Sequence, residues 1–263
     1  MSLRVVLALV CLCAATSAQA GGPPVLLALR LTSGERVVEH SDLVDRIAWK
    51  LAPDRLAVFR SQGVIIDEDV RTSIVATGVV LSVRHGAARI QGDVITSVHD
   101  VPRNQFTGSR DRGISTVTPR NTQAGTKLYA LEDAPMVDLP SAPVALGSTW
   151  TTAQRVLTSL GSGTATFTHR VASFEGGLVR IDVTGHGAIT GKEYNLPRLL
   201  PGTIALRGTA WFDPATGLVS QESYRIDDTL VKHQGGNDIG FVERLDADTD
   251  VHKEASTHRS KRP

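Results

Sequence analysis

Cysteine is almost missing from this chain, and so are aromatic residues, a surplus of charge of either sign and long apolar runs. Both cysteines, Cys11 and Cys13, lie near the N-terminus. Positive and negative side chains nearly balance, with 28 Lys+Arg against 27 Asp+Glu, so no electrostatic attraction to nucleic acid is expected. Aromatics make up 5% of the chain, which favours scattered core packing over a platform for sugars.

The first twenty residues have the pattern of a secretory signal peptide. Arg4 supplies a positive start, Val5–Ala15 is a short apolar core, and Ala18-Gln19-Ala20 ends in the small-x-small pattern of a cleavage site. A membrane helix needs about 20 apolar residues, so no transmembrane segment is expected in the mature chain. We therefore expect export to the periplasm or the extracellular space, with cleavage after Ala20 and loss of both cysteines.

The stretch from Gly202 to Ile226 illustrates how the chain is built. Apolar residues of one parity alternate with polar residues of the other, which is the period of a half-buried strand. The apolar set is Ile204, Leu206, Ala210 and Phe212, and the polar set is Thr203, Arg207 and Thr209. Asp213-Pro-Ala-Thr-Gly217 then supplies the residues that turns prefer. The pattern predicts a β-hairpin.

Similar units recur along the chain. Val75, Val79, Leu81 and Val83 share one parity before a turn at Arg84–Ala87, and a second alternating run follows to Val98. Further hairpins are predicted over 25–39 and 165–184, with a last strand over 239–251. This spacing predicts an all-β fold, or a mainly β fold with one or two short helices. We expect about ten antiparallel strands in a partly open barrel or a sandwich.

One stretch fits two structures. Residues 41–52 fit a helix with Ser41 or Asp42 as N-cap and Pro53 as its stop, and they fit a strand equally well. We expect a single domain over residues 21–251, with halves at 21–99 and 126–251 that are either unlike or duplicated. The polar, aperiodic stretch 100–125 is predicted to be the loop that joins them. Residues 252–263 are predicted to be a disordered basic tail.

Signatures of catalysis and of metal binding are missing too. Asp246, Asp248 and Asp250 share a strand face, but Val251 and Thr257 stand where a calcium loop needs Gly and Glu, so a solvated outer face is predicted. The histidines form no His-x-His or His-Glu-x-x-His motif, and no serine lies in Gly-x-Ser-x-Gly. We expect no catalytic residue, no metal site and no cofactor.

Two short motifs carry a family resemblance. Leu139–Trp150 contains Pro-Val-x-x-Gly-x-x-Trp, and Phe212–Leu218 reads Phe-Asp-x-x-Thr-Gly-Leu. Over residues 134–251 the chain resembles exported bacterial β-rich proteins of unassigned function, which are broadly similar to the half-barrel of lipoprotein-carrier proteins. The resemblance implies a location in the cell envelope and a concave apolar face, and it implies no catalytic residue.

Three hypotheses about function follow. The first is a non-enzymatic binding module that holds a lipid or another apolar or amphipathic ligand on a concave sheet. Its cavity would be lined by the following residues: Val79, Leu81, Ile181, Val183, Leu206 and Phe241. The second is an envelope scaffold that binds a protein partner and has a filled core. The third is a hydrolase, which would need polar groups with shifted pKa values in one cleft.

Overall fold

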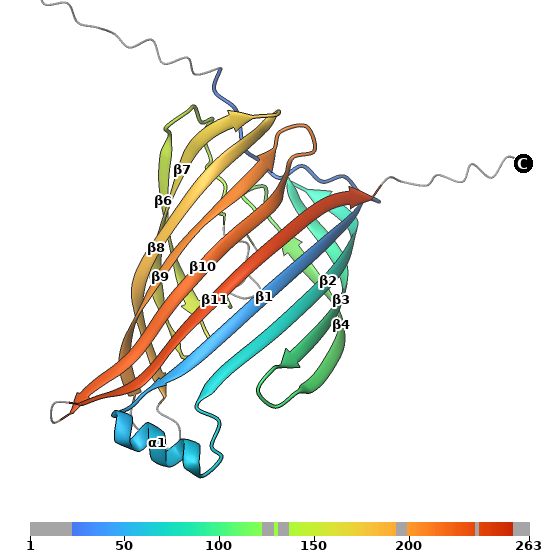
Figure 1. Cartoon of the computed structure of the whole chain (residues 1–263). Helices are drawn as coiled ribbons and strands as arrows, with labels where there is room; N and C mark the ends of the chain where they lie inside the picture. Colours follow the sequence, from blue (N-terminus) through green and yellow to red (C-terminus); the bar gives the residue numbers. More distant parts are fainter. Residues whose placement is uncertain (1–22, 123–128, 131–136, 193–198, 235–236, 255–263) are drawn as a thin grey trace, which may run out of the picture.

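A single curved antiparallel sheet forms the protein in the computed structural model (Figure 1). The structure describes residues 23–122, 129–130, 137–192, 199–234 and 237–254. Eleven strands follow one another in the order β4-β3-β2-β1-β11-β10-β9-β8-β7-β6-β5. Every neighbouring pair is antiparallel except β5 with β6, which is parallel. The predicted all-β class is thereby confirmed.

The first half of the sequence supplies five strands and one helix. Their bounds are β1 Arg36–Lys50, α1 Pro53–Ser61, β2 Asp67–Arg84, β3 Ala87–Asp100, β4 Gln105–Val117 and β5 Tyr129–Ala130. The second half supplies six strands: β6 Thr149–Leu157, β7 Ser162–Glu175, β8 Leu178–Lys192, β9 Leu199–Asp213, β10 Leu218–Gln234 and β11 Asn237–Glu254.

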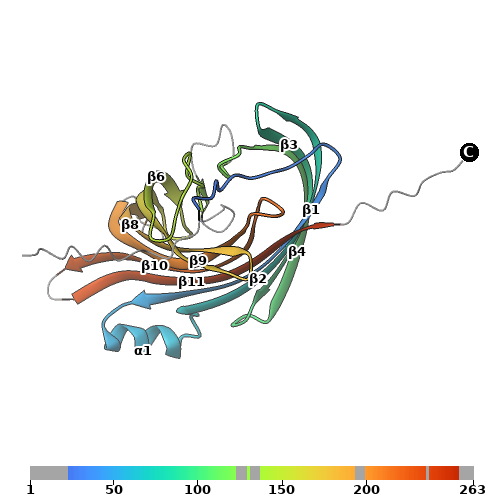
Figure 2. The ribbon, with the colours of Figure 1, turned by 90° about the horizontal axis from the view of Figure 1, so that it is seen from above.

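The sheet curves strongly and stays open. Seen from above, it bends into a trough, and the N-terminal segment crosses the open side (Figure 2). The first and last strands in the order, β4 and β5, are not paired with each other, so the sheet is a half-barrel and not a closed barrel. Of the two predicted architectures, the partly open barrel is the one that forms.

Residues 41–50 are strand, which settles one open question of the sequence. They belong to β1, which pairs with β2 on one side and with β11 on the other. The one helix starts directly afterwards, with Pro53 in its first turn, where the missing N–H costs nothing. Pro53 was expected to stop a helix, and it begins one.

Three segments differ from the sequence prediction. Residues 105–117, predicted to lie in a joining loop, form strand β4. The predicted opening hairpin is absent from the described residues, because Val25 makes only an isolated bridge to Val144. The chain also continues as strand to Glu254, three residues into the predicted tail. The predicted signal peptide and residues 255–263 lie outside the described residues.

The β9–β10 hairpin is confirmed, and its turn is held as its residues suggest. The Asp213 carboxylate accepts hydrogen bonds from the Ala215 N–H and the Thr216 hydroxyl, both at 2.8 Å. Gly217 has a φ of 68°. The Arg30 N–H donates to the Gly217 carbonyl at 2.9 Å, which fastens the N-terminal segment to this turn.

The core lies on the concave face of β6–β11 and joins the predicted halves. Its side chains come from alternate residues of these strands and from two segments that lie across them. The cluster reaches β1 and β2 only at Leu43 and, less deeply, at Ile74. Strand β1 lies in the first predicted half and β11 in the second. Because these two strands pair with each other, the predicted halves form one continuous sheet. None of the described helices is long and apolar enough to cross a membrane.

Candidate functional site

Four of the six predicted lining residues lie on the concave face. Ile181, Val183 and Leu206 are buried in the core cluster, and Phe241 is buried beside the Trp49 ring, with centroids 5.3 Å apart. The sheet thus brings together residues from β8, β9 and β11, as the alternation predicted.

Val79 and Leu81 were assigned to the wrong side. Both are exposed, at 40% and 39%, whereas Val80 between them is 1% exposed. The pairing of β2 with β3 is irregular between Val80 and Ser82, where one extra residue enters β2. This bulge alters the alternation only from Leu81 onward. Val79 lies before the bulge, and it was misassigned because both parities of β2 are apolar: Val75 and Val79 face outward, whereas Ile74 and Val80 face inward.

The chain covers much of its own concave face. Leu27, Val137 and Leu139 are fully buried, and Val144 is 5% exposed. We call the segments 25–30 and 137–144 the plug. They are joined to each other by the Val25–Val144 bridge, in which each backbone N–H donates to the other residue's carbonyl at 2.8 Å. Ile181, Val183 and Leu206 therefore face the core that the plug completes.

The Pro-Val-x-x-Gly-x-x-Trp motif builds this plug. Gly147 has a φ of 80°, and its N–H donates to the Val171 carbonyl at 2.9 Å. The Trp150 indole N–H donates to the Asp138 carbonyl at 2.7 Å, and its ring stacks on the buried His169 with centroids 5.0 Å apart. The motif thus ties the segment around Asp138 to strands β6 and β7.

Asp138 is a buried carboxyl at the edge of the plug. The Gln154 side-chain amide donates to its Oδ2 at 2.6 Å. Burial raises the pKa of Asp138, and the hydrogen bond from Gln154 and the charge of Arg120 oppose that rise. A hydrogen bond with the Thr152 hydroxyl opposes the rise as well, so the contacts of Asp138 join the plug to β6.

A second buried acidic group lies farther along the same face. Asp228 and Glu243 stand directly opposite each other on β10 and β11, and they are 0% and 2% exposed. The Ser159 hydroxyl donates to Glu243, and burial raises the pKa of Asp228. Two adjacent carboxyls could share one proton, as acid–base catalysts do. Both carboxyls are buried, so their proximity bears on the stability of the fold.

The concave face is less covered over β1–β3, a region we call the wing. Its inward residues on β2 and β3 are aliphatic side chains of intermediate exposure together with two threonines: Val70, Thr72, Ile74, Ala76, Ile90, Val94, Thr96 and Val98. The core cluster ends at Leu43 and Ile74. The wing is therefore a mainly apolar surface next to the core, and it is the candidate binding surface.

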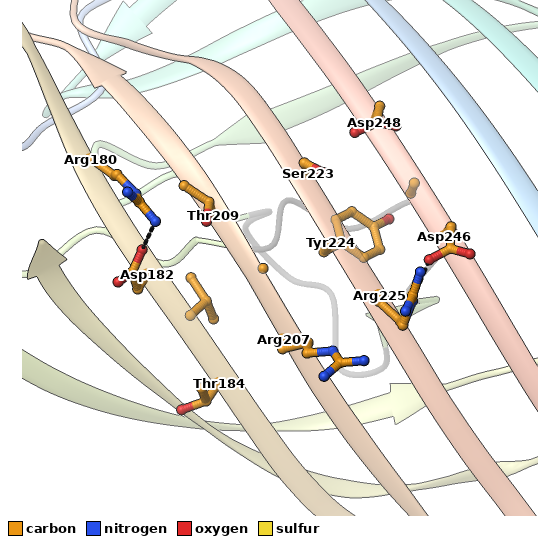
Figure 3. A pocket seen from close by; sticks show the side chains of 13 residues that line it. Arg180, Asp182, Thr184, Arg207, Thr209, Ser223, Tyr224, Arg225, Asp246 and Asp248 are labelled. Carbon is orange, nitrogen blue, oxygen red and sulfur yellow. Dashed lines mark hydrogen bonds and ion pairs between the residues drawn. The ribbon is translucent and has the colours of Figure 1, made fainter.

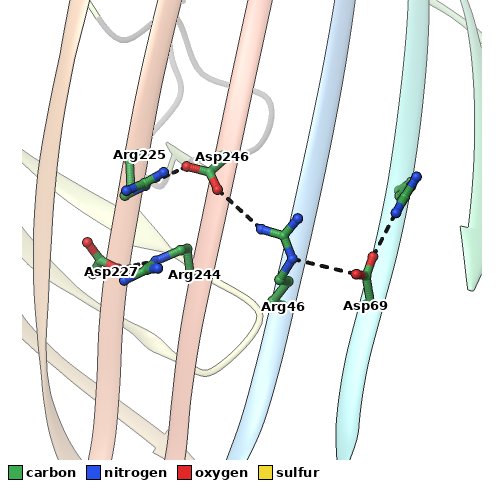
Figure 4. A network of polar contacts seen from close by, with 7 residues as sticks. Arg46, Asp69, Arg225, Asp227, Arg244 and Asp246 are labelled. Carbon is green, nitrogen blue, oxygen red and sulfur yellow. Dashed lines mark hydrogen bonds and ion pairs between the residues drawn. The ribbon is translucent and has the colours of Figure 1, made fainter. Parts of the chain in front are cut away.

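The convex face is charged and carries a chain of ion pairs across four strands (Figure 4). Asp246 on β11 accepts from Arg225 at 2.5 Å and from Arg46 at 3.4 Å. Arg46 also forms an ion pair with Asp69 at 3.5 Å, and Asp69 forms a further ion pair with Arg71 at 3.5 Å. The predicted solvated outer face is thus confirmed for Asp246, and the described residues contain no group of three metal ligands.

A shallow groove of about 690 Å³ crosses the same face over β8–β11 (Figure 3). Arg207 and Arg225 stand directly opposite each other in it. Arg225 is neutralised by Asp246, and in the described part of the chain no carboxylate pairs with Arg207. Thr184, Thr209 and Ser223 add hydroxyl groups to the groove. It is open and polar, unlike the wing.

The comparisons with known proteins give no family. No family model matches the chain, and no curated protein matches it. Among solved structures, an outer membrane channel from Pseudomonas putida F1 is 9% identical, with a TM-score of 0.26, over 85% of this chain and 97% of the channel. A mutant porin of Rh. blastica is 7% identical, with a TM-score of 0.26, over 82% of this chain and 100% of the porin. This similarity is weak, and no activity carries over from it.

Proposed function

We propose that this protein is an exported, non-enzymatic binding protein that holds the acyl chain of an amphipathic ligand against the wing. Export is inferred from the signal-peptide pattern that ends at Ala20. The ligand's polar end would remain at the rim of the trough, in contact with water.

One observation carries the proposal: aliphatic side chains continue along the concave face beyond the place where the plug ends. Ile74, Val94 and Val98 face the same side as the buried Leu43, yet all three remain partly exposed. Burial of apolar surface contributes roughly 25 cal/mol per Å², so an acyl chain that extends the core over the wing would be held without any charged contact. Thr72 and Thr96 on the same face offer hydroxyl groups.

The resemblance noted in the sequence supports the same proposal. The Pro143–Trp150 motif builds the plug, and the Phe212–Leu218 motif makes the β9–β10 turn that anchors Arg30. Both motifs thus contribute to the cover of the concave face. A half-barrel with a partly covered trough suits a carrier of lipid or of a lipid-modified molecule.

A matched pair of variants on one strand tests the proposal. Val94 faces the trough, and Ile95, which is 46% exposed, faces the convex side. Purified mature protein is titrated with a fluorescent long-chain fatty acid. We expect Val94→Asp to weaken binding by about tenfold or more, because it places a carboxylate against the chain, and Ile95→Asp to bind like the wild type.

Failure of the wild type to bind the probe, together with native mass spectrometry that finds no ligand on protein from its host, would reject the proposal. Equal loss in both variants would also reject the wing as the site. Circular dichroism of each variant checks that the sheet is retained.

A further inference from the structure

Strand β4 ends the sheet with an uncovered edge. It pairs with β3 over its full length, and no described residue pairs with its other side. Eleven consecutive residues, from Gln105 to Ser115, are exposed. Because exposure runs through both parities, neither face of this strand is covered by the rest of the described chain.

A long open edge is unusual in a protein that remains monomeric. Backbone N–H and C=O groups along such an edge are a template for another strand, and natural edges are usually blocked by charged side chains. The arginine side chains of β4 do not block its edge in this way, because they are bound to a carboxylate of β3. Arg110 reaches across to Asp93 on β3, with Nε to Oδ1 at 2.8 Å, and Arg112 contacts the same carboxylate at 3.4 Å.

These ion pairs are fully formed at neutral pH. The hydrogen bond from Arg110 lowers the pKa of Asp93 to about 2, so the carboxylate is charged under all physiological conditions. The guanidinium of Arg110 is thereby directed at the sheet and away from the open edge.

We propose that β4 pairs with β4 of a second copy in antiparallel orientation, about a two-fold axis at Arg110. This axis is chosen because Arg110 is the middle residue of the exposed run Gln105–Ser115. The register therefore pairs every exposed residue of one strand with an exposed residue of the other. A two-fold contact of this kind closes on itself and leads to a dimer.

The side chains fit this register on both faces. Phe106, which is 72% exposed, comes opposite Ile114, which is 53% exposed, and the symmetry makes this apolar pair twice. On the concave face Ser109 comes opposite Asp111, a hydroxyl donor opposite a carboxylate acceptor. Arg112 comes opposite Gly108, which leaves it room.

The axis itself brings two arginines together. Like charges directly opposite each other are destabilising in a sheet. Asp93 of each copy contacts both Arg110 and Arg112, and Asp111 on β4 supplies a second negative charge. Two arginines and two aspartates per copy therefore leave no net charge around the axis. The Phe106 ring is also positioned in advance, since it stacks on His99 with centroids 4.0 Å apart.

Solution mass tests the interface with a control from the same face. Sedimentation of the mature protein is expected to show a dimer, and Ile114→Lys is expected to raise the dimer dissociation constant at least about tenfold. Val79→Lys, also exposed on the convex face but on the inner strand β2, is expected to leave the dimer unchanged. A wild-type monomer at high concentration, or a larger open-ended oligomer, would overturn the proposal.

Disulfide trapping tests the register. In a chain with Cys11→Ser and Cys13→Ser, Arg110→Cys places two sulfurs on the axis, within the span of about 4.4–6.8 Å between Cα atoms that a disulfide needs. Rapid oxidation to a covalent dimer is expected. Asp111→Cys should cross-link much more slowly, because the two copies of residue 111 are offset along the strands. Equal rates, or faster linking at residue 111, would reject this register.

Discussion

At the scale of single residues, the main finding is a pair of buried carboxyls in a sheet that otherwise buries aliphatic side chains. Asp228 faces Glu243 across the strands, with Asp45, Thr158 and Ser159 close by. Two adjacent buried carboxylates cannot both be charged cheaply. Burial raises the pKa of Asp228, the charges of Asp45 and Asp227 add to the rise, and hydrogen bonds with Glu243 and Thr158 oppose it. The raised pKa makes stability depend on pH.

The sign of this dependence follows from the direction of the shift. Folding raises the pKa of Asp228, so folding favours its protonated form. The stabilisation is fully present below the unfolded pKa, about 3.9, and is lost as pH rises through the folded value. We expect Asp228→Asn to remove this loss and to be more stable than the wild type at pH 7 by about 1 kcal/mol. Urea unfolding between about pH 4 and 8 measures it.

Asp182→Asn is the control, because Asp182 lies on the convex face, pairs with Arg180 at 3.1 Å and is not among the groups that shift the pKa of Asp228. Its pH profile should follow that of the wild type. A profile for Asp228→Asn with the wild-type slope would contradict the assignment.

Residue-scale prediction from the sequence succeeded where alternation is regular. Ile181, Val183, Leu206 and Phe241 lie inside because β8, β9 and β11 keep their period of two. The error at Val79 arises because both parities of β2 carry aliphatic residues, so alternation alone does not select the inward face. Leu81 lies at the irregular pairing next to Val80, which depends on the partner strand.

At the scale of elements, the plug connects the fold to the proposed site. Its position rests on a few specific contacts, among them the bond from the Trp150 indole to the Asp138 carbonyl. Trp150→Phe keeps an aromatic ring for the stack on His169 but removes that donor. We expect a loss of about 1 kcal/mol in the free energy of unfolding, with faster amide hydrogen exchange in residues 137–144.

Trp211→Phe provides the comparison, since Trp211 lies in β9 on the convex face. It should leave exchange in residues 137–144 unchanged. If both variants speed exchange equally, the plug is not held by Trp150.

A strand was easier to predict from the sequence when one of its faces is buried and the other is exposed. The β7–β8 and β9–β10 hairpins were predicted because one face of each is apolar. The β2–β3 hairpin was also predicted, but with the inward face of β2 reversed. Strand β4 was taken for a loop because both of its faces are exposed, so its sequence has no period. Residues 41–50 were ambiguous because Leu43 and Ile47 fit the spacing of a helix and that of a strand. They form a strand because they pair with β2 and β11.

At the scale of the whole molecule, the two faces of the sheet are stabilised differently. The concave face buries apolar surface, whereas the convex face carries partly exposed ion pairs centred on Asp246. Exposed pairs contribute about 0–1 kcal/mol and are screened by salt. Asp246→Asn should therefore cost about 1 kcal/mol at low salt and less in about 0.5 M NaCl, as measured by urea unfolding.

Asp248→Asn on the same strand is the reference, since no ion pair of Asp248 is formed within the described residues. It should change stability little at either salt concentration. A loss of several kcal/mol in Asp246→Asn that salt does not reduce would contradict this account.

The order of the strands also limits how early during synthesis the sheet can be completed. The central pair joins Arg36 to Glu254, so strand β1 acquires its second neighbour only when the last strand has been made. The ribosome synthesises the N-terminal end first. Strand β1 therefore cannot pair with β11 until almost the entire polypeptide has been made. Contacts so distant in sequence make assembly slow. The nascent chain thus stays incompletely folded for most of its synthesis, a state compatible with the export proposed above.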